Sequence, residues 1–467
     1  MSVMTSALNR LAGLALLTLF TSFAQAQVWE KPVVPGMTYR MEVQNDPKRV
    51  IHALKVDPTL FRAESHLARH TVYDSSRNNG RDTTSGMVLQ HGAVAGINGD
   101  FFQWGNDPGG APENLTVRGG ELIRNPKSGS RAQVLAWGPG IPFQMGEGTW
   151  RASVWSNGQE IAPIGALNSR GMRGNVTLFT DTAAEAYCDD EATYVVVRSG
   201  PYRLGTVDRL AGTVEEVIRG NRRVRVPYGR FVLAGCGGGR PKIDGLKIGD
   251  RVEVAVETSG FDWSRVDHTM GGGPILLVGG TYVGPETEGD SFNDTRHPRT
   301  VVGRTSTGEI WYVVIDGRQP ESVGASLRES AQIMAALGCA DAINLDGGGS
   351  SAINALGLTL NRPSGGTERP VANGILLYGV RPVATTAKIE LTAPDSVPLD
   401  GSGNATVTLD GQAAADRDVI WSCQGAAWID QTGAIRPLRD GKAEIAALVR
   451  GVIVRKTITI GKGEGGR

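Results

Sequence analysis

Two short apolar segments, each followed at once by an aspartate, constrain the fold of this chain more than any other feature. Residues 309–315 (EIWYVVI) precede Asp316, and residues 342–345 (AINL) precede Asp346. Both segments have the length and composition of buried strands. The residues between them carry a helical pattern, so the three pieces form a strand–helix–strand unit. Such a connection makes its two strands parallel, and we therefore expect both aspartates beyond one edge of the same sheet, where α/β proteins bind ligands.

The helix of this unit is marked at both ends. Ser326 and Glu329 have the spacing of a capping box, in which each residue satisfies a backbone N–H of the other. Gly338 stands where glycine commonly follows the last helical turn. The pattern predicts a helix over residues 326–338, and the one other good helical candidate is residues 84–91.

The predicted fold class is α+β, with a large strand-rich domain over residues 27–382 that has the strand–helix–strand unit near its C-terminal end. Short apolar or alternating segments separated by Gly, Pro, Asn and Asp clusters fill most of this region, a pattern typical of strands and turns. Residues 383–387 are expected to be a linker. Residues 388–461 alternate again between Asp-Gly and Thr-Gly turns, which predicts a small all-β sandwich. Residues 462–467 are expected to be a disordered tail.

The N-terminal residues 1–26 resemble a signal peptide. Arg10 precedes an apolar run over residues 11–23, and Ala24-Gln25-Ala26 matches a small-residue cleavage site. We therefore expect an exported protein, periplasmic, secreted or on the surface of a bacterium; an uncleaved anchor is the alternative. No later segment has the length of a transmembrane helix, so no membrane span is expected after cleavage.

Charge and cysteine content exclude several classes of protein. The chain carries 48 basic and 48 acidic residues, which gives no electrostatic signature for nucleic acid or an anionic membrane. It has four cysteines and no C-x-x-C pair, so zinc and redox motifs are not supported. The pairing that we expect is Cys188–Cys236, and Cys339 is expected to be a buried thiol. The chain has no P-loop, dinucleotide fingerprint or G-x-S-x-G elbow.

Polar residues with the chemistry of a binding site cluster in a few glycine-rich motifs. The candidate site residues outside the two aspartates are Asn98, Asp100, Arg299, Arg318, Gly348, Gly349, Ser350, Glu368, Arg369 and Asn373. Arginine suits bidentate capture of phosphate or carboxylate, and successive glycine amides suit an anion. Each motif taken alone also fits an ordinary turn or an exposed loop. Asp290, Asn293 and Asp294 could hold a hard cation through oxygen atoms, although a solvated loop is the other reading.

The ordered motifs together resemble the phosphodiester glycosidase family. They are INGDFF, GGGPILL, HPRTVVG, VIDGRQPESVGASL, AINLDGGGSS and ERPVANGI, and the resemblance spans roughly residues 36–380. Asp100 departs from the family, which more usually has glycine or a small residue there. The C-terminal motifs VIWSCQGAAWIDQTGAIRP and DGKAEIAA resemble a bacterial Ig-like domain of the group 2 type.

The resemblance implies a hydrolase that cleaves the glycosidic C–O bond of a sugar-1-phosphodiester, such as an N-acetylglucosamine-1-phosphodiester, in envelope or extracellular polysaccharide. Asp316 and Asp346 would then share the roles of base and stabiliser of the oxocarbenium-like centre. Arginines would hold the phosphate and asparagines the sugar, the residues being Arg299, Arg318, Arg369, Asn98 and Asn373. No cofactor or metal site is predicted, and a divalent cation such as calcium is the alternative. A non-catalytic glycan-binding protein and a phosphodiesterase that breaks P–O are the competing interpretations.

Overall fold

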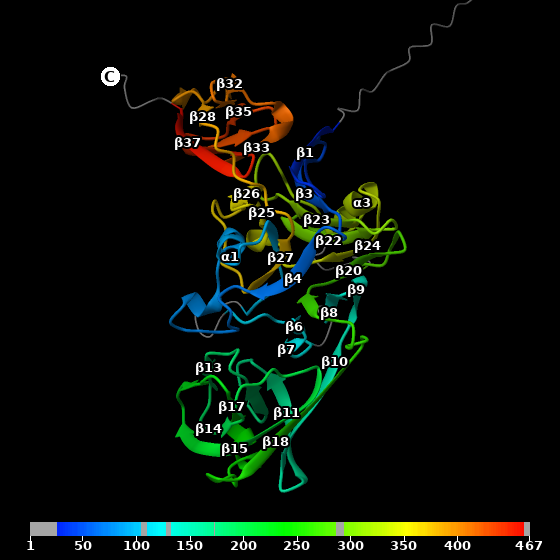
Figure 1. Ribbon diagram of the computed structural model, residues 1–467, viewed down its shortest axis with the longest axis vertical. Helices are drawn as coiled ribbons and strands as arrows, with labels where there is room; N and C mark the ends of the chain where they lie inside the picture. The colour runs from blue at the N-terminus through cyan, green and yellow to red at the C-terminus, as the bar shows by residue number, and fades with distance from the viewer. Residues whose placement is uncertain (1–25, 104–109, 128–131, 172, 286–293, 462–467) are drawn as a thin grey trace, which may run out of the picture.

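The computed structural model describes residues 26–103, 110–127, 132–171, 173–285 and 294–461, so the predicted signal peptide (except Ala26) and the predicted tail over residues 462–467 lie outside it. The structure is 51 % strand and 8 % helix, which confirms the strand-rich fold class. The central part of the molecule lies between a β-barrel at one end and the small C-terminal sheets at the other (Figure 1). No helix in these described ranges is long and apolar enough to cross a membrane.

The centre of the molecule is an eight-stranded sheet in which every neighbouring pair is antiparallel. Its order is β1 (Gln27–Val34), β2 (Met37–Asn45), β3 (Lys48–Val56), β23 (Ile310–Ile315), β22 (Arg299–Thr305), β24 (Cys339–Asn344), β20 (Ile275–Val278) and β21 (Thr281–Tyr282). The predicted strand–helix–strand unit is β23, α3 (Leu327–Ala336) and β24. Its two strands run parallel to each other, as expected, but β22 lies between them and pairs with both.

Helix α3 has the ends that the sequence predicts. The Glu329 N–H donates to the Ser326 hydroxyl over 3.1 Å, and the Ser326 N–H donates to the Glu329 carboxylate over 2.9 Å. Gly338 has a φ of 83°, a conformation that glycine adopts without steric cost. The predicted helix over residues 84–91 is also present as α1 (Thr84–Gln90).

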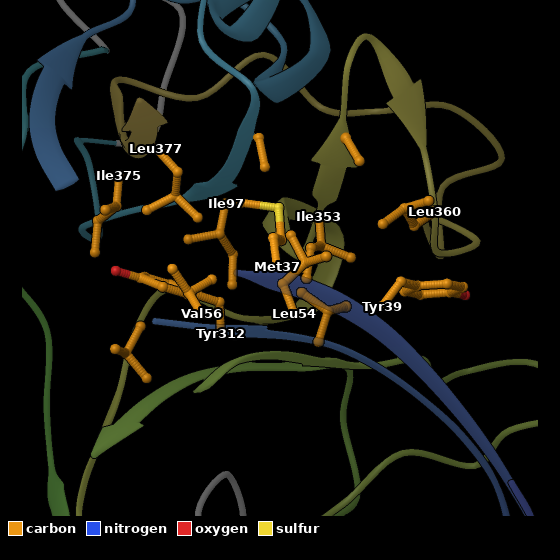
Figure 2. Close-up of a cluster of buried hydrophobic side chains, with 14 of the residues drawn as sticks. Met37, Tyr39, Leu54, Val56, Ile97, Tyr312, Ile353, Leu360, Ile375 and Leu377 are labelled. Atoms are coloured by element: carbon orange, nitrogen blue, oxygen red, sulfur yellow. The ribbon is translucent and has the colours of Figure 1, made fainter. Parts of the chain in front are cut away.

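A second sheet packs against the central one and encloses the main core. Its order is β26 (Leu358–Thr359), β25 (Ile353–Ala355), β5 (Ala95–Asn98), β27 (Asn373–Tyr378) and β4 (Arg62–Leu67). Met37, Leu54 and Tyr312 of the first sheet meet Ile97 and Ile375 of the second (Figure 2). A third sheet, β7 (Glu121–Arg124), β6 (Thr116–Arg118), β19 (His268–Gly271), β8 (Gln133–Gly138) and β9 (Ile141–Glu147), continues from this core.

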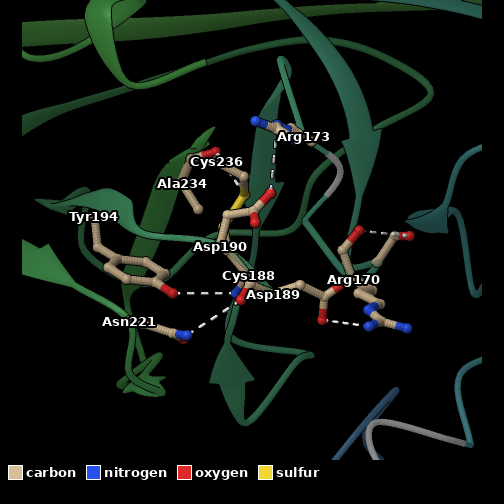
Figure 3. The surroundings of a disulfide bond; sticks show 10 residues. Arg170, Arg173, Cys188, Asp189, Asp190, Tyr194, Asn221, Ala234 and Cys236 are labelled. Carbon is tan, nitrogen blue, oxygen red and sulfur yellow. Dashed lines mark hydrogen bonds and ion pairs between the residues drawn. A yellow bond between two sulfur atoms is a disulfide. The ribbon is translucent and has the colours of Figure 1, made fainter. Parts of the chain in front are cut away.

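Residues 149–259 contain a closed barrel with its own apolar core, which the sequence analysis did not distinguish from the surrounding strands. Its order is β10 (Thr149–Ser156), β11 (Gln159–Leu167), β12 (Val176–Phe179), β17 (Arg230–Cys236), β14 (Ala192–Arg198), β15 (Val207–Gly220) and β18 (Arg251–Ser259). The disulfide Cys188–Cys236, which the sequence predicts, ties the end of β17 to the segment before β14 (Figure 3). Cys339 is a buried free thiol, as expected, and so is Cys423.

The C-terminal strands form three small sheets that dock on β1. They are built from β28 (Ile389–Thr392), β31 (Thr406–Leu409), β32 (Gln412–Ala413), β29 (Ser396–Val397), β37 (Val452–Ile460), β36 (Gly441–Val449), β33 (Val419–Gly425), β30 (Gly403–Asn404), β35 (Ala434–Pro437) and β34 (Ala427–Ile429). Lys31 of β1, only 2 % exposed, donates to the carbonyls of Asp416 and Val419, each over 2.8 Å. Ile420 and Trp428 join the main core, so the contact is both polar and apolar.

Candidate active site

The turn that follows β24 is fixed by backbone contacts to two other segments. The Asp346 N–H donates to the Gly99 carbonyl over 3.0 Å, and the Asn98 amide donates to the Asp346 carbonyl over 2.7 Å. The Gly348 N–H donates to the Pro298 carbonyl over 2.8 Å. The segments after β5 and before β22 therefore hold the turn in place, and the side chain of Asp346 is half-buried at its start.

Two guanidinium groups lie against the glycines of this turn. A β-carbon added to Gly348 would lie 3.2 Å from Nη2 of Arg318, and one added to Gly349 would collide with the guanidinium of Arg369. Arg369 also donates to the hydroxyl of Ser350 over 3.4 Å. Glycine is thus required at both positions for the arginines to approach the backbone. The structure brings together five of the predicted residues here, from three segments that are distant in the sequence.

Arg318 has a strained backbone. Its φ of 60° lies in the left-handed region, which a residue with a side chain seldom adopts. Strain of this kind persists only where the surrounding structure imposes it, and it is concentrated at functional sites. The side chain is exposed, and its Nη2 lies 3.2 Å from Nδ1 of His297. Burial, together with Arg299 and Arg318, lowers the pKa of His297, so its neutral ring can accept this hydrogen bond at neutral pH.

Arg299 adds a buried positive charge close to Arg318. It is 1 % exposed, and its Nε donates to the Ala325 carbonyl over 2.9 Å. Burial and the neighbouring Arg318 lower the pKa of Arg299 to about 10, so it still carries its charge at neutral pH.

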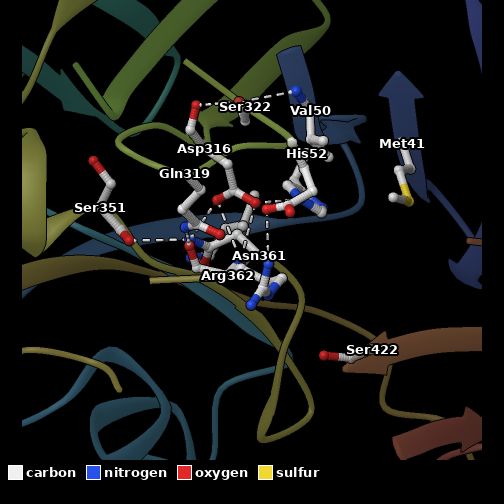
Figure 4. A network of polar contacts seen from close by, with 12 residues as sticks. Met41, Val50, His52, Asp316, Gln319, Ser322, Ser351, Asn361, Arg362 and Ser422 are labelled. Carbon is white, nitrogen blue, oxygen red and sulfur yellow. Dashed lines mark hydrogen bonds and ion pairs between the residues drawn. The ribbon is translucent and has the colours of Figure 1, made fainter. Parts of the chain in front are cut away.

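Asp316 lies in a buried polar network of its own (Figure 4). Its carboxylate, 3 % exposed, accepts from the Asn361 amide over 3.2 Å and from the Arg362 N–H over 3.1 Å. His52 Nε2 lies 3.2 Å from the same carboxylate, and His52 Nδ1 lies 2.8 Å from the Tyr39 hydroxyl. These contacts occupy both oxygens of the carboxylate.

A chain of hydrogen bonds joins the two aspartates. Asn361 donates to the Ser351 carbonyl over 3.1 Å, and the hydroxyls of Ser351 and Thr300 lie 3.1 Å apart. Thr300 donates to Oδ1 of Asn98 over 2.8 Å. Asn98, which donates to the Asp346 carbonyl, completes the connection. Both aspartates therefore belong to one edge of the sheet, although only Asp346 is half-exposed.

Asp100 and Asn373 lie behind the glycine turn. The Asp100 N–H donates to the Asn373 side chain over 2.8 Å, and the Asp100 carboxyl accepts from the Asn114 N–H over 2.8 Å. Oδ1 of Asp100 and Nδ2 of Asn373 are buried and have no hydrogen-bond partner within the described residues. Burial raises the pKa of Asp100 to about 8, with smaller contributions from nearby acids that include Glu113 and Asp346. Asp100 is consequently a neutral carboxylic acid at pH 7.

Glu368 contacts helix α1. Its carboxylate accepts from the Ser85 N–H over 2.9 Å, in the first turn of that helix, and bonds the hydroxyl of Thr359. A carboxylate at a helix N-terminus satisfies an N–H that has no partner within the helix. This role accounts for the contacts that Glu368 makes.

The described part of the chain has no group of three or more His, Cys, Asp or Glu side chains arranged to hold a metal ion. Of the three residues suggested for a hard cation, Asp290 and Asn293 lie outside the described residues and Asp294 is exposed.

Sequence reasoning did not assign a role to His52 or to Arg362. His52 lies between apolar residues in the middle of β3, in the run VIHAL, and that position was the signal that could have identified it. Arg362 acts through its backbone N–H on Asp316, and no side-chain motif can show such a contact.

Part of this chain matches a known protein family. Residues 212–378 match the family described as phosphodiester glycosidase. A segment of 84 residues is 33 % identical to the SPbeta prophage-derived uncharacterized protein YomE of Bacillus subtilis (strain 168), and it covers 18 % of this chain and 13 % of YomE.

Two solved structures share the fold. One is a hypothetical protein from Synechocystis, with a TM-score of 0.62, 19 % identity and coverage of 76 % of this chain and 64 % of that chain. The other is a protein from Burkholderia pseudomallei K96243 that is described as a putative exported protein. Its TM-score is 0.59 at 21 % identity, and the match covers 71 % of this chain and 74 % of that chain.

Proposed function

Because residues 212–378 match the phosphodiester glycosidase family, we propose that the chain is an exported hydrolase that cleaves the C–O bond of a sugar-1-phosphodiester. The observation that carries the proposal is the pair of guanidinium groups, from Arg318 and Arg369, against the glycine turn that begins at Asp346. A phosphodiester is an anion, and paired guanidinium groups are suited to bind it in a bidentate manner.

The reaction follows from the charges around this turn. Arg318 and Arg369 bind the phosphodiester, and the buried charge of Arg299 strengthens the local positive potential. Water then attacks the anomeric carbon as its bond to the phosphate oxygen breaks. The electron pair of that bond leaves with the phosphate, giving a phosphomonoester, and one water proton passes to a base. Stabilisation by the arginines reduces the need to protonate the leaving group.

We assign the base or oxocarbenium-stabilising role to Asp346, since its side chain is half-exposed at the turn. Asp316 is buried and engaged by three neighbouring residues, which supports a positioning role. Both the oxygen and the nitrogen of the Asn98 amide already have hydrogen-bond partners, so we assign Asn98 the role of positioning Asp346. The buried amide nitrogen of Asn373 has no partner among the described residues, so we assign it the role of donating a hydrogen bond to the sugar.

Export is supported by the signal-like N-terminus and by the disulfide Cys188–Cys236, since disulfides persist in oxidising compartments. The expected substrates are envelope or extracellular glycans that contain sugar-1-phosphodiesters, and N-acetylglucosamine is the sugar that we propose. The C-terminal sheets would then serve contact with polysaccharide or cell wall.

The test is release of reducing sugar from the methyl phosphodiester of N-acetylglucosamine-1-phosphate by the full chain. Asp346→Asn should reduce turnover by about 10³-fold, the scale of losing an acid–base group, and leave the melting temperature unchanged. Asp400→Asn, an exposed turn residue, is the matched control. Saturable binding of the diester without turnover by the unmodified chain would support a glycan-binding protein instead.

A further inference from the structure

A cavity lies away from the candidate active site. It has a volume of about 720 Å³, which is within the range of small-molecule pockets. Aromatic side chains from four segments line it: Phe61, Trp137, Phe143, Tyr312 and Tyr378. Aliphatic side chains, among them Val56 and Leu377, complete the wall.

The cavity and Asp316 lie at opposite ends of the same two strands. Val56, in the cavity wall, pairs with Ile310 at the start of β23, whereas Ile51 pairs with Ile315 immediately before Asp316. Five residues of extended strand separate the two ends, or about 16 Å. A ligand in this cavity would therefore not occupy the phosphate site.

Most polar groups around the cavity already have partners. Trp137 Nε1 donates to the Ala63 carbonyl over 2.8 Å, so the indole presents only apolar surface. Arg62 pairs with Glu64 and lies over the ring of Tyr378, which compensates its charge. Burial lowers the pKa of His268 to about 4, so this ring is neutral at pH 7. Asp267, half-buried in the lining, is the remaining charged group and disfavours anions.

Tyr312 is the exception to this pattern. The residue as a whole is 2 % exposed and lines the cavity, and no hydrogen bond joins its hydroxyl to another of the described residues. The ring of Phe143 packs edge-on against it, with centroids 6.2 Å apart. The hydroxyl oxygen is not one of the fully buried polar atoms that lack a partner, so it is open to the cavity, where a ligand atom can form a hydrogen bond with it.

We propose that this cavity binds an uncharged, mainly apolar small molecule that places one oxygen or nitrogen within hydrogen-bond distance of Tyr312. The aromatic wall supplies apolar contact area, and the single hydroxyl fixes the orientation of the ligand. Glu64 compensates the charge of Arg62, and Asp267 is negative, so the lining disfavours acidic molecules.

The neutral fluorophore N-phenyl-1-naphthylamine, which has one N–H on an apolar body, is a suitable probe. Titration into the full chain should give a saturable rise in fluorescence with one site per chain. Leu60, 50 % exposed at the cavity, offers a site for a charge: Leu60→Lys should weaken binding at least about tenfold. Ile248→Lys, at a residue 71 % exposed on the far barrel, is the control and should bind like the unmodified chain.

Tyr312→Phe removes the hydroxyl and keeps the ring, so the fold should be retained. The loss of one neutral hydrogen bond should weaken probe binding by about two- to tenfold. Binding that does not saturate, or that is equal in the unmodified chain and in Leu60→Lys, would overturn the proposal. Equal affinity of Tyr312→Phe and the unmodified chain would overturn the assigned role of the hydroxyl. None of these readouts depends on hydrolytic activity.

Discussion

The Nδ2 atom of Asn361 lies 3.2 Å from Oδ1 of Asp316, 45 residues earlier in the chain, and holds a buried carboxylate at the edge of the central sheet. The C-terminal sheets hold Asn361 in turn, because Gln424 donates to its carbonyl over 2.9 Å. Arg362, the next residue, donates to the Gly425 carbonyl over 3.0 Å. The C-terminal part of the chain thus supports the loop on which Asp316 depends.

Replacing Asn361 with leucine should destabilise the protein and reduce turnover. The change removes a donor from a buried carboxylate, at a cost of about 1–3 kcal/mol in the free energy of unfolding. Denaturant unfolding measures this cost, and Asn404→Leu, at an exposed position, is the control. If Asn361→Leu unfolds at the same denaturant concentration as the unmodified chain, the network does not hold Asp316 as described.

Arg318→Lys and Arg369→Lys should each raise KM for a phosphodiester substrate by about tenfold. Lysine keeps the charge but loses the paired N–H donors that match a phosphate, a difference of about 1–2 kcal/mol. Steady-state kinetics with the methyl phosphodiester measures the effect, with Arg203→Lys on the exposed surface as control. An unchanged KM in both variants would remove these arginines from the phosphate site.

Asp100 should make the protein less stable as the pH rises. Burial raises its pKa from the ordinary 3.8 to about 8, so the folded state binds a proton that the unfolded state releases. The stabilisation is complete below pH 3.8 and is lost as the pH rises through about 8, with a slope of at most about 1.4 kcal/mol per pH unit. Between pH 5 and about 8, the unfolding free energy of the unmodified chain should therefore fall with rising pH, whereas that of Asp100→Asn should change less. Parallel profiles would contradict the assigned pKa.

Removing the disulfide should destabilise the barrel. Cys188 and Cys236 are separated by 48 residues, and opening a loop of that length costs about 2–5 kcal/mol. The double variant Cys188→Ala, Cys236→Ala should have a lower melting temperature than the unmodified chain under non-reducing conditions. Cys339→Ala and Cys423→Ala probe the free buried thiols and should not change the response to a reducing agent.

Local chemistry explains which parts of the fold the sequence could predict. The ends of α3 follow from Ser326, Glu329 and Gly338, whose effects act over three or four residues, and the structure shows each of them. The insertion of β22 between β23 and β24 could not be predicted, because strand order depends on pairing between distant segments. Closure of the barrel depends on register in the same way.

The candidate site also contains residues that local motifs predict and contacts that they do not. Arg318 and Gly348 stand in glycine-rich motifs at strand ends, and the structure brings them together. Glu368 has the same local appearance, yet its carboxylate contacts the first turn of α1. The network of His52 and Arg362 around Asp316 joins three distant segments, so no local pattern could reveal it.

Hydrolysis of the methyl phosphodiester of N-acetylglucosamine-1-phosphate in water enriched with ¹⁸O tests the central claim most directly. Water that attacks the anomeric carbon leaves its oxygen on the sugar, so mass spectrometry should find one ¹⁸O in the released N-acetylglucosamine and none in methyl phosphate. Heavy oxygen in the phosphate product would show cleavage of the P–O bond and would contradict the assignment of this chain as a glycosidase.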